Sequence, residues 1–206
     1  MTTRIKVCGI TNRADASLAV ELGADALGFI FYTKSPRCVK VSMAADICNL
    51  IPPFVAKVGV FVDAPDHEIK QVMHECLLTA VQFHGHESPR FCRRFSAKSI
   101  KAIRVKDAAS LQAAAEYDVD AVLLDTYTAE QAGGTGQAFD WSLAVQAKQV
   151  LRPPVILAGG LTPDNVAEAI RAVRPYAVDV ASGVEQAPGR KDPEKMRRFF
   201  EACRSV

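Results

Sequence analysis

The sequence lacks any apolar run long enough to cross a membrane. No stretch approaches the roughly 18 consecutive apolar residues that a transmembrane helix requires, so no membrane partner is expected. Met1 is followed by Thr-Thr-Arg rather than by an apolar signal segment, and the six cysteines include no Cys-x-x-Cys pair. Together these absences predict a cytoplasmic protein whose thiols stay reduced.

The sequence also lacks an excess of charge of either sign. The 25 Lys and Arg residues nearly balance the 23 Asp and Glu residues, and they are spread along the chain rather than massed. No nucleic-acid partner is therefore expected. The sequence also has no Gly-x-Gly-x-x-Gly after its first apolar run, which argues against an open, doubly wound sheet.

What the sequence does contain is a strand-then-helix pattern that repeats eight times. The predicted strands cover residues 5–8, 26–31, 57–62, 79–83, 100–105, 121–125, 155–158 and 177–180. The predicted helices cover residues 13–22, 43–51, 66–75, 89–95, 108–117, 140–149, 163–172 and 193–203. Ser88, Thr162 and Asp192 stand just before prolines that suit the start of a helix, and we expect them to be N-caps.

This pattern predicts an α/β fold in which parallel strands are buried on both faces. Eight short, nearly all-apolar strands close most economically as a (β/α)8 TIM barrel. The chain of 206 residues is long enough for one core, and no linker or low-complexity stretch divides it. We therefore expect residues 1–206 to form a single barrel domain. An open, doubly wound sheet is the alternative.

Two residues that could exchange protons stand at the ends of predicted strands. Cys8 closes the first strand and Asp125 closes the sixth. Because the C-terminal ends of barrel strands converge on one mouth, both side chains could face one small molecule and act as a general acid/base pair. The alternatives are a structural buried cysteine and a helix-capping carboxylate.

Glycine-rich loops follow the last two predicted strands. Gly159 and Gly160 come after the seventh strand, and Ser182 and Gly183 come after the eighth. Main-chain N–H groups can approach an anion closely there, which predicts a phosphate site, although paired glycines also make tight turns. A bulky side chain at Gly183 is expected to occupy the space of the anion. The loop over residues 126–138 has three glycines in four positions and is either a lid or a solvated connection.

Six motifs occur in an order that is specific to one family. They are residues 6–11 (Lys-Val-Cys-Gly-Ile-Thr), 35–37 (Ser-Pro-Arg), 82–85 (Gln-Phe-His-Gly), 125–126 with 133–136 and 139–141, 157–161 with 165–166, and 182–185 with 189–192. Together they closely resemble the phosphoribosylanthranilate isomerase family, from residue 4 to about residue 200. Phe83 and Ala181 depart from the family pattern, and Ala181 removes a hydroxyl near the expected phosphate.

The resemblance implies the Amadori rearrangement of tryptophan biosynthesis, in which N-(5-phosphoribosyl)anthranilate becomes 1-(2-carboxyphenylamino)-1-deoxyribulose 5-phosphate. Opening the sugar ring needs a proton on the ring oxygen, and the resulting iminium makes the proton on C2 acidic. A general acid and a general base suffice, so no metal and no cofactor is expected. By motif, Asp125 is the acid and Cys8 is the base. Asp125 must then stay protonated, and Cys8 must be partly ionised.

The same resemblance implies residues that bind the substrate. Arg37 is the candidate for the anthranilate carboxylate, because a guanidinium matches it bidentately, and an exposed loop cation is the alternative. Asp179 either binds a sugar hydroxyl or forms an ion pair inside the barrel. Lys6 faces inward with Cys8 and is expected to balance buried carboxylates. His84 is placed among the substrate-binding residues, and we reject a metal site with His86, since no third ligand has suitable spacing.

Other functions remain open at this point. An indoleglycerol-phosphate synthase or a pentose-phosphate epimerase would keep the phosphate loops but would need a catalytic lysine or a metal-binding set, which we do not find. A noncatalytic phosphosugar-binding barrel would bind without turnover, and a scaffold barrel would need an exposed amphipathic stripe. The expected partner is a small phosphosugar substrate. A monomer is favoured, with a homodimer as the alternative.

Overall fold

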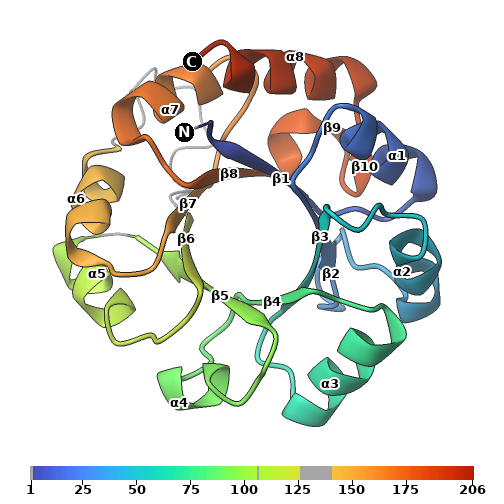
Figure 1. Ribbon diagram of the computed structural model, residues 1–206, viewed down its shortest axis with the longest axis horizontal. Coiled ribbons are helices and arrows are strands. Elements are labelled where there is room, and N and C mark those ends of the chain that lie inside the picture. Colours follow the sequence, from blue (N-terminus) through green and yellow to red (C-terminus); the bar gives the residue numbers. More distant parts are fainter. Residues whose placement is uncertain (1, 106, 126–140) are drawn as a thin grey trace.

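The computed structural model describes residues 2–105, 107–125 and 141–206. Eight parallel strands close into a barrel in sequence order, with the last strand beside the first (Figure 1). The strands are β1 (Arg4–Cys8), β2 (Ala26–Ile30), β3 (Ala56–Phe61), β4 (Ala80–Phe83), β5 (Lys98–Arg104), β6 (Ala121–Asp125), β7 (Val155–Ala158) and β8 (Ala177–Val180). The predicted (β/α)8 barrel is confirmed, and the open sheet is excluded.

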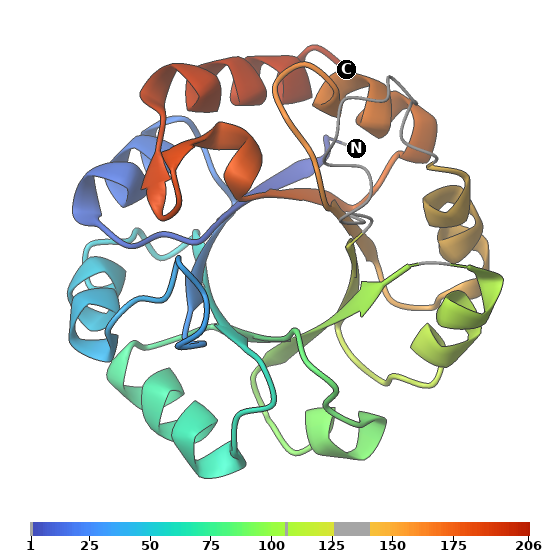
Figure 2. The same ribbon diagram turned by 180° about the vertical axis from the view of Figure 1, so that it is seen from behind.

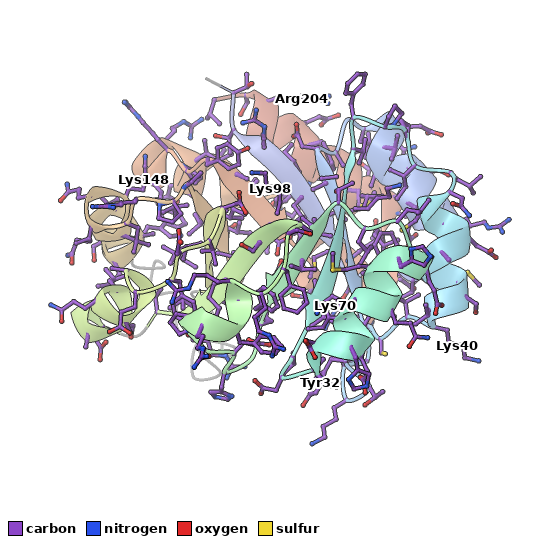
Figure 3. The ribbon with its side chains drawn as sticks, turned by 60° about the horizontal axis from the view of Figure 1, so that its bottom comes forward. Tyr32, Lys40, Lys70, Lys98, Lys148 and Arg204 are labelled. Carbon is purple, nitrogen blue, oxygen red and sulfur yellow. The ribbon has the colours of Figure 1, made fainter. Side chains whose placement is uncertain are left out.

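Helices surround the barrel on all sides when it is seen from either end (Figures 1 and 2). They are α1 (Arg13–Glu21), α2 (Val41–Cys48), α3 (Asp66–Glu75), α4 (Pro89–Cys92), α5 (Ala108–Ala114), α6 (Ser142–Val150), α7 (Val166–Val173) and α8 (Pro193–Arg204). None of these described helices is long and apolar enough to span a bilayer. Seen from the side, Arg204 lies at one end of the barrel and Tyr32, which follows β2, lies at the other (Figure 3).

Helix starts agree with the expected caps at two of three places. Ser88 accepts a hydrogen bond from the Phe91 amide, and Asp192 accepts from two amides at the start of α8. Thr162 was a wrong expectation, because α7 begins only at Val166. The Asn165 side chain accepts from the Thr162 amide at 2.8 Å and donates to the Gly160 carbonyl at 3.0 Å, so it holds the preceding turn as a loop.

Helix α4 is also shorter than expected and ends at Cys92 rather than at residue 95. Phe95 turns back and packs on Phe83 and Phe91, with ring centroids 5.3 and 5.5 Å away. The contacts among these three rings take the place of a further turn of helix. Aromatic pairs contribute about 0.5–1.5 kcal/mol beyond simple burial, which favours this arrangement. Tertiary packing outweighs the local helical spacing in this segment.

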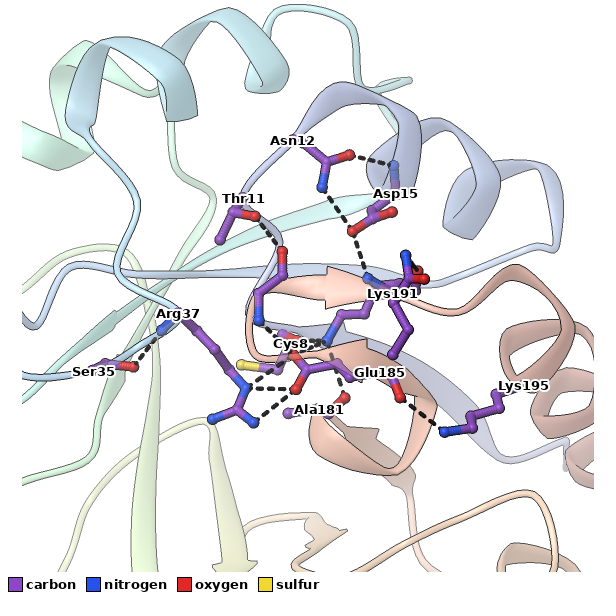
Figure 4. Close-up of polar contacts among 12 residues, drawn as sticks. Cys8, Thr11, Asn12, Asp15, Ser35, Arg37, Ala181, Glu185, Lys191 and Lys195 are labelled. Carbon is purple, nitrogen blue, oxygen red and sulfur yellow. Dashed lines mark hydrogen bonds and ion pairs between the residues drawn. The ribbon is translucent and has the colours of Figure 1, made fainter.

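Three short elements between β8 and α8 were not anticipated. A single-turn 3-10 helix, η2 (Ser182–Val184), leads into a hairpin of β9 (Glu185–Ala187) and β10 (Arg190–Lys191). Gly189 has a φ of 76° in the turn, and its carbonyl accepts a hydrogen bond from the Thr11 hydroxyl. The hairpin therefore lies against the loop that follows β1 (Figure 4).

Side chains inside the barrel alternate with those that face the helices. Small and branched apolar groups fill the interior: Val58, Ala80, Ile100, Ala102, Ala121, Leu123, Ile156, Ala158 and Ala177. Four buried side chains with polar or thiol groups share this inward parity: Lys6, Cys8, Gln82 and Asp179. Burying such groups is costly unless they are paired, so their concentration toward the C-terminal end of the barrel marks the functional site.

Candidate active site

A cavity of about 470 Å³ opens at the C-terminal mouth of the barrel. It is lined by Cys8, Ile30, Arg37, Val60, Gln82, His84, Leu123, Asp125, Ala158, Gly159, Gly160, Leu161, Asp179, Val180, Ala181, Ser182 and Gly183. All nine residues expected from the sequence to form the site are in this set. Barrel closure brings them together from β1, β6 and β8 and from the loops after β2, β4, β7 and β8.

Cys8 ends β1 and is 5% exposed, with its thiol bordering the cavity. Its neighbour across the ladder is Gly28 of β2, where a Cβ atom would lie only 2.7 Å from the sulfur. Burial raises the pKa of the Cys8 thiol, while the charges of Lys6 and Lys191 act to lower it. A glycine at position 28 thus leaves room for a thiol that has cations nearby.

Arg37 is anchored before any ligand arrives. Its Nε donates to both carboxylate oxygens of Glu185 at 2.9 and 3.0 Å, and its Nη2 donates to one of them at 2.7 Å (Figure 4). Gly9, with a φ of 76°, allows this approach, since a Cβ atom there would lie 2.9 Å from Arg37 Cδ. The Nε side of the guanidinium is occupied by Glu185, which leaves its outer edge, Nη1 and Nη2, for a ligand.

Glu185 is held in turn by Lys191. The Lys191 ammonium donates to Glu185 Oε1 at 3.0 Å and to the carbonyl oxygens of Cys8 and Ala181 at 2.7 and 3.0 Å. Burial favours a higher pKa for Glu185, but Arg37 and Lys191 outweigh it and lower the pKa. Sequence reasoning missed this cluster, although Glu185 and Lys191 both stand in the last motif, residues 182–185 with 189–192.

His84 and Asp125 meet across the cavity. The Nε2 atom of His84 lies 3.5 Å from Asp125 Oδ2, and its Nδ1 atom lies 2.9 Å from the amide nitrogen of Gln82. Because an amide nitrogen only donates, Nδ1 must accept in this orientation, which puts the ring proton on Nε2 facing Asp125. His86 does not join them: its side chain is 98% exposed and pairs with Asp63.

Gln82 is a lining residue that the sequence reasoning passed over. It is 1% exposed, and its Oε1 atom has no hydrogen-bond partner among the described residues. Buried polar atoms without partners are rare and call for an explanation, such as a ligand donor. The signal was available in the sequence, since Gln82 shares the parity of Ala80 and stands at the end of the strand before His84.

The loops after β7 and β8 carry the expected glycines. Gly159 and Gly160 have φ values of 85° and 64°, and a Cβ atom at Gly160 would meet nothing within 4 Å. Ser182 and Gly183 begin η2, so their N–H groups have no partner within that helix. The expectation for Gly183 is corrected: a Cβ atom there would lie 1.8 Å from the Leu161 carbonyl oxygen, so a side chain collides with the neighbouring loop first.

Asp179 forms the ion pair that was one of its two expected roles. Its Oδ1 atom lies 2.8 Å from the Lys6 ammonium, and the two residues are direct neighbours across β8 and β1. Lys6 is 3% exposed and does not line the cavity, whereas Asp179 does. The candidate lid over residues 126–138 lies outside the described residues.

Comparison with known proteins identifies the family. The family described as N-(5'-phosphoribosyl)anthranilate (PRA) isomerase matches residues 5–202. An N-(5'-phosphoribosyl)anthranilate isomerase from Trichlorobacter lovleyi is 52% identical over 203 residues, covering 98% of each chain. The chain belongs to this family.

Solved structures of N-(5'-phosphoribosyl)anthranilate isomerases have the same fold as this chain. The phosphoribosyl anthranilate isomerase of Thermotoga maritima has a TM-score of 0.91 and 42% identity over the whole of both chains. A second structure, with a TM-score of 0.88 and 40% identity over the whole of both chains, holds reduced 1-(o-carboxyphenylamino)-1-deoxyribulose 5-phosphate. No group of three or more metal-ligating side chains occurs in the part of the chain that the structure describes.

Proposed function

We propose that this chain isomerises N-(5'-phosphoribosyl)anthranilate by general acid/base catalysis, with Asp125 as the acid and Cys8 as the base. As a member of the family it is an isomerase of tryptophan biosynthesis. The observation that carries the assignment is that one cavity is bordered by Cys8, Asp125, Arg37 and both glycine loops. A substrate with a carboxylate at one end and a phosphate at the other needs this combination.

The chemistry follows from the two proton-transfer groups. The Asp125 carboxyl gives its proton to the ring oxygen, the bond from that oxygen to C1 breaks, and the nitrogen lone pair forms an iminium. The Cys8 thiolate then takes the proton from C2, and the electrons of that C–H bond form a C1–C2 double bond while the iminium is neutralised. Tautomerisation of this enolamine gives the ketone.

Recognition is assigned to the two ends of the cavity. Arg37 offers its outer edge to the anthranilate carboxylate, and Glu185 behind it keeps the guanidinium plane fixed. The N–H groups of Gly160, Ser182 and Gly183, which all line the cavity, are assigned to the phosphate. His84 donates toward Asp125, and Gln82 fixes its tautomer.

The deciding experiment supplies freshly made phosphoribosylanthranilate and follows the loss of anthranilate-type fluorescence. We expect Cys8→Ala to lower kcat by about 10²- to 10⁴-fold and Asp125→Asn to be at least as damaging, because each removes a proton-transfer group. Cys48→Ala is the matched control, since Cys48 is an equally buried thiol outside the cavity. Folded wild-type protein that binds product without turnover would instead be a noncatalytic phosphosugar-binding barrel.

Assembly and cellular location complete the proposal. One solved relative is described as a dimeric enzyme from Thermotoga maritima that was turned into monomers. That relative supports a homodimer in place of the monomer expected from the sequence. The six free cysteines, including a catalytic thiol, suit the reducing cytoplasm. We further propose that residues 1–206 form a single barrel domain.

A further inference from the structure

A buried thiol makes a poor base unless something stabilises its negative form. Burial raises the pKa of Cys8, so within the barrel the neutral thiol is favoured. Three charged groups of the described residues face it: Lys6 from β1, Asp179 from β8 and Lys191 from β10. The two ammonium groups are the candidates for stabilising a thiolate, and their surroundings differ.

Lys191 has no donor left for the sulfur. An ammonium has three N–H bonds, and Lys191 directs them at Glu185 and at the carbonyl oxygens of Cys8 and Ala181. Its charge is neutralised by the Glu185 carboxylate, and burial lowers its pKa despite that partner. Lys191 therefore holds the backbone of Cys8 rather than its side chain.

Lys6 is placed differently. It stands two residues before Cys8 on the same inward face of β1, and its ammonium donates to Asp179 Oδ1 at 2.8 Å. A Cβ atom at Gly28 would lie 2.7 Å from Cys8 Sγ and 3.1 Å from Lys6 Nζ, so the sulfur and the ammonium border one small space. Burial lowers the pKa of Lys6, but the charge of Asp179 and the neighbouring Cys8 outweigh burial and raise the pKa.

From this arrangement, and resting on Cys8 as the proposed base, we propose that Lys6 is the cation that stabilises the thiolate of Cys8 during the isomerisation. Lys6 does not line the cavity, so it acts through Cys8 and is a positioning residue. Asp179 keeps Lys6 protonated and in place, and Gly28 leaves the space in which the sulfur and the ammonium approach each other.

The test measures Cys8 itself rather than turnover. The rate of Cys8 alkylation by iodoacetamide, followed by mass spectrometry of its peptide from pH 6 to 11, reports the thiol pKa. We expect Lys6→Met to raise that pKa by about 1 to 3 units, the usual effect of losing a neighbouring opposite charge. The acid limb of the profile of kcat/KM against pH should also move to higher pH.

Lys101→Met is the matched control, because it removes an ammonium that is 2% exposed and 2.8 Å from Glu87, away from Cys8. The pKa of Cys8 should not change in this variant.

A folded Lys6→Met protein with an unchanged Cys8 pKa would overturn the inference. Because that variant leaves Asp179 as an unpaired buried carboxylate, which can prevent folding, a second comparison uses Asp179→Asn and the double variant Lys6→Met/Asp179→Asn. The double variant should show the higher Cys8 pKa, again by about 1 to 3 units, and equal values would contradict the role of Lys6. Alkylation needs no substrate, so a failure of the isomerase assay is a separate result.

Discussion

At the residue scale, the site depends on side chains that prepare others. Arg37 is fixed by Glu185, His84 by Gln82, and the backbone of Cys8 by Lys191. Such support reduces the conformational entropy that binding would otherwise cost, so the groups that touch the ligand need little rearrangement. The supporting residues are more deeply buried than the groups they hold, and they come from three different strands, β9, β4 and β10.

Gln82→Leu tests this support directly. It replaces the amide with an apolar side chain of similar size. The hydrogen bond to His84 is removed, so the imidazole ring loses the partner that fixes its tautomer. We expect the activation barrier to rise by about 1 kcal/mol, which lowers kcat about fivefold. Steady-state kinetics on the purified variant, with circular dichroism as the fold control, measure this effect. Full activity would show that His84 needs no partner.

At the scale of elements, the β9–β10 hairpin connects the carboxylate-binding side of the site to the catalytic strand. Its Glu185 and Lys191 hold Arg37 and the end of β1, while Gly189 contacts Thr11. Two strands of three and two residues have no stability of their own, so the hairpin forms because these buried contacts hold it. The contacts are ionic, and its stability should therefore depend on pH.

Acid should weaken the protein through Glu185. Its pKa in the folded protein lies below the unfolded value, so its contribution is present above about pH 4.3 and is lost as the pH falls through the folded pKa. Between pH 7 and pH 3, the free energy of unfolding in urea should fall less for Glu185→Gln than for the wild type. Exposed Glu168→Gln is the control and should fall as the wild type does. An equal fall in the free energy of unfolding for all three proteins would contradict a stabilising role for the ionised Glu185.

At the scale of the whole molecule, the two ends of the barrel have different character. The C-terminal mouth holds the cavity with Cys8 and Asp125, and the opposite end has a larger hollow of about 1000 Å³ near Arg4, Arg152 and Arg171. Both ends could attract an anion by charge. Only the C-terminal end combines glycine loops with a helix start, which is the usual phosphate arrangement of a barrel.

Inorganic phosphate should therefore inhibit competitively and raise the Tm by binding the folded state. Gly160→Val should abolish the rise in Tm, because its side chain projects into open space beside the cavity and its φ of 64° suits glycine. Arg171→Ala, at the opposite hollow, should keep the full rise. If only Arg171→Ala lost the rise in Tm, the anion would bind at the opposite end of the barrel, which would contradict the proposed phosphate site. Gly183→Ala is unsuitable, since it collides with Leu161.

The sequence by itself predicted the barrel and nine of the residues that line the cavity. Strands β6, β7 and β8 and helix α3 have the predicted bounds, because hydrophobic period records which face of each element is buried. Strand ends then located the candidate residues, since all parallel strands of a barrel finish at one mouth. Helices α4 and α7 were predicted too long where Phe95 and Asn165 make tertiary and local side-chain contacts that spacing does not record.

Only the tertiary structure decided which polar groups are partners. Arg37 and Glu185 are 148 residues apart in the chain, and Lys6 and Asp179 are 173 apart. The β1–β8 register at the closure of the barrel pairs Lys6 with Asp179, and the β9–β10 hairpin brings Glu185 to Arg37 of the loop after β2. A pattern read along the chain carries no information about either contact. Strand parity alone places Lys6 on the inward face with Cys8, but only the structure shows that Gly28 of β2 leaves a space bordered by both the sulfur and the ammonium.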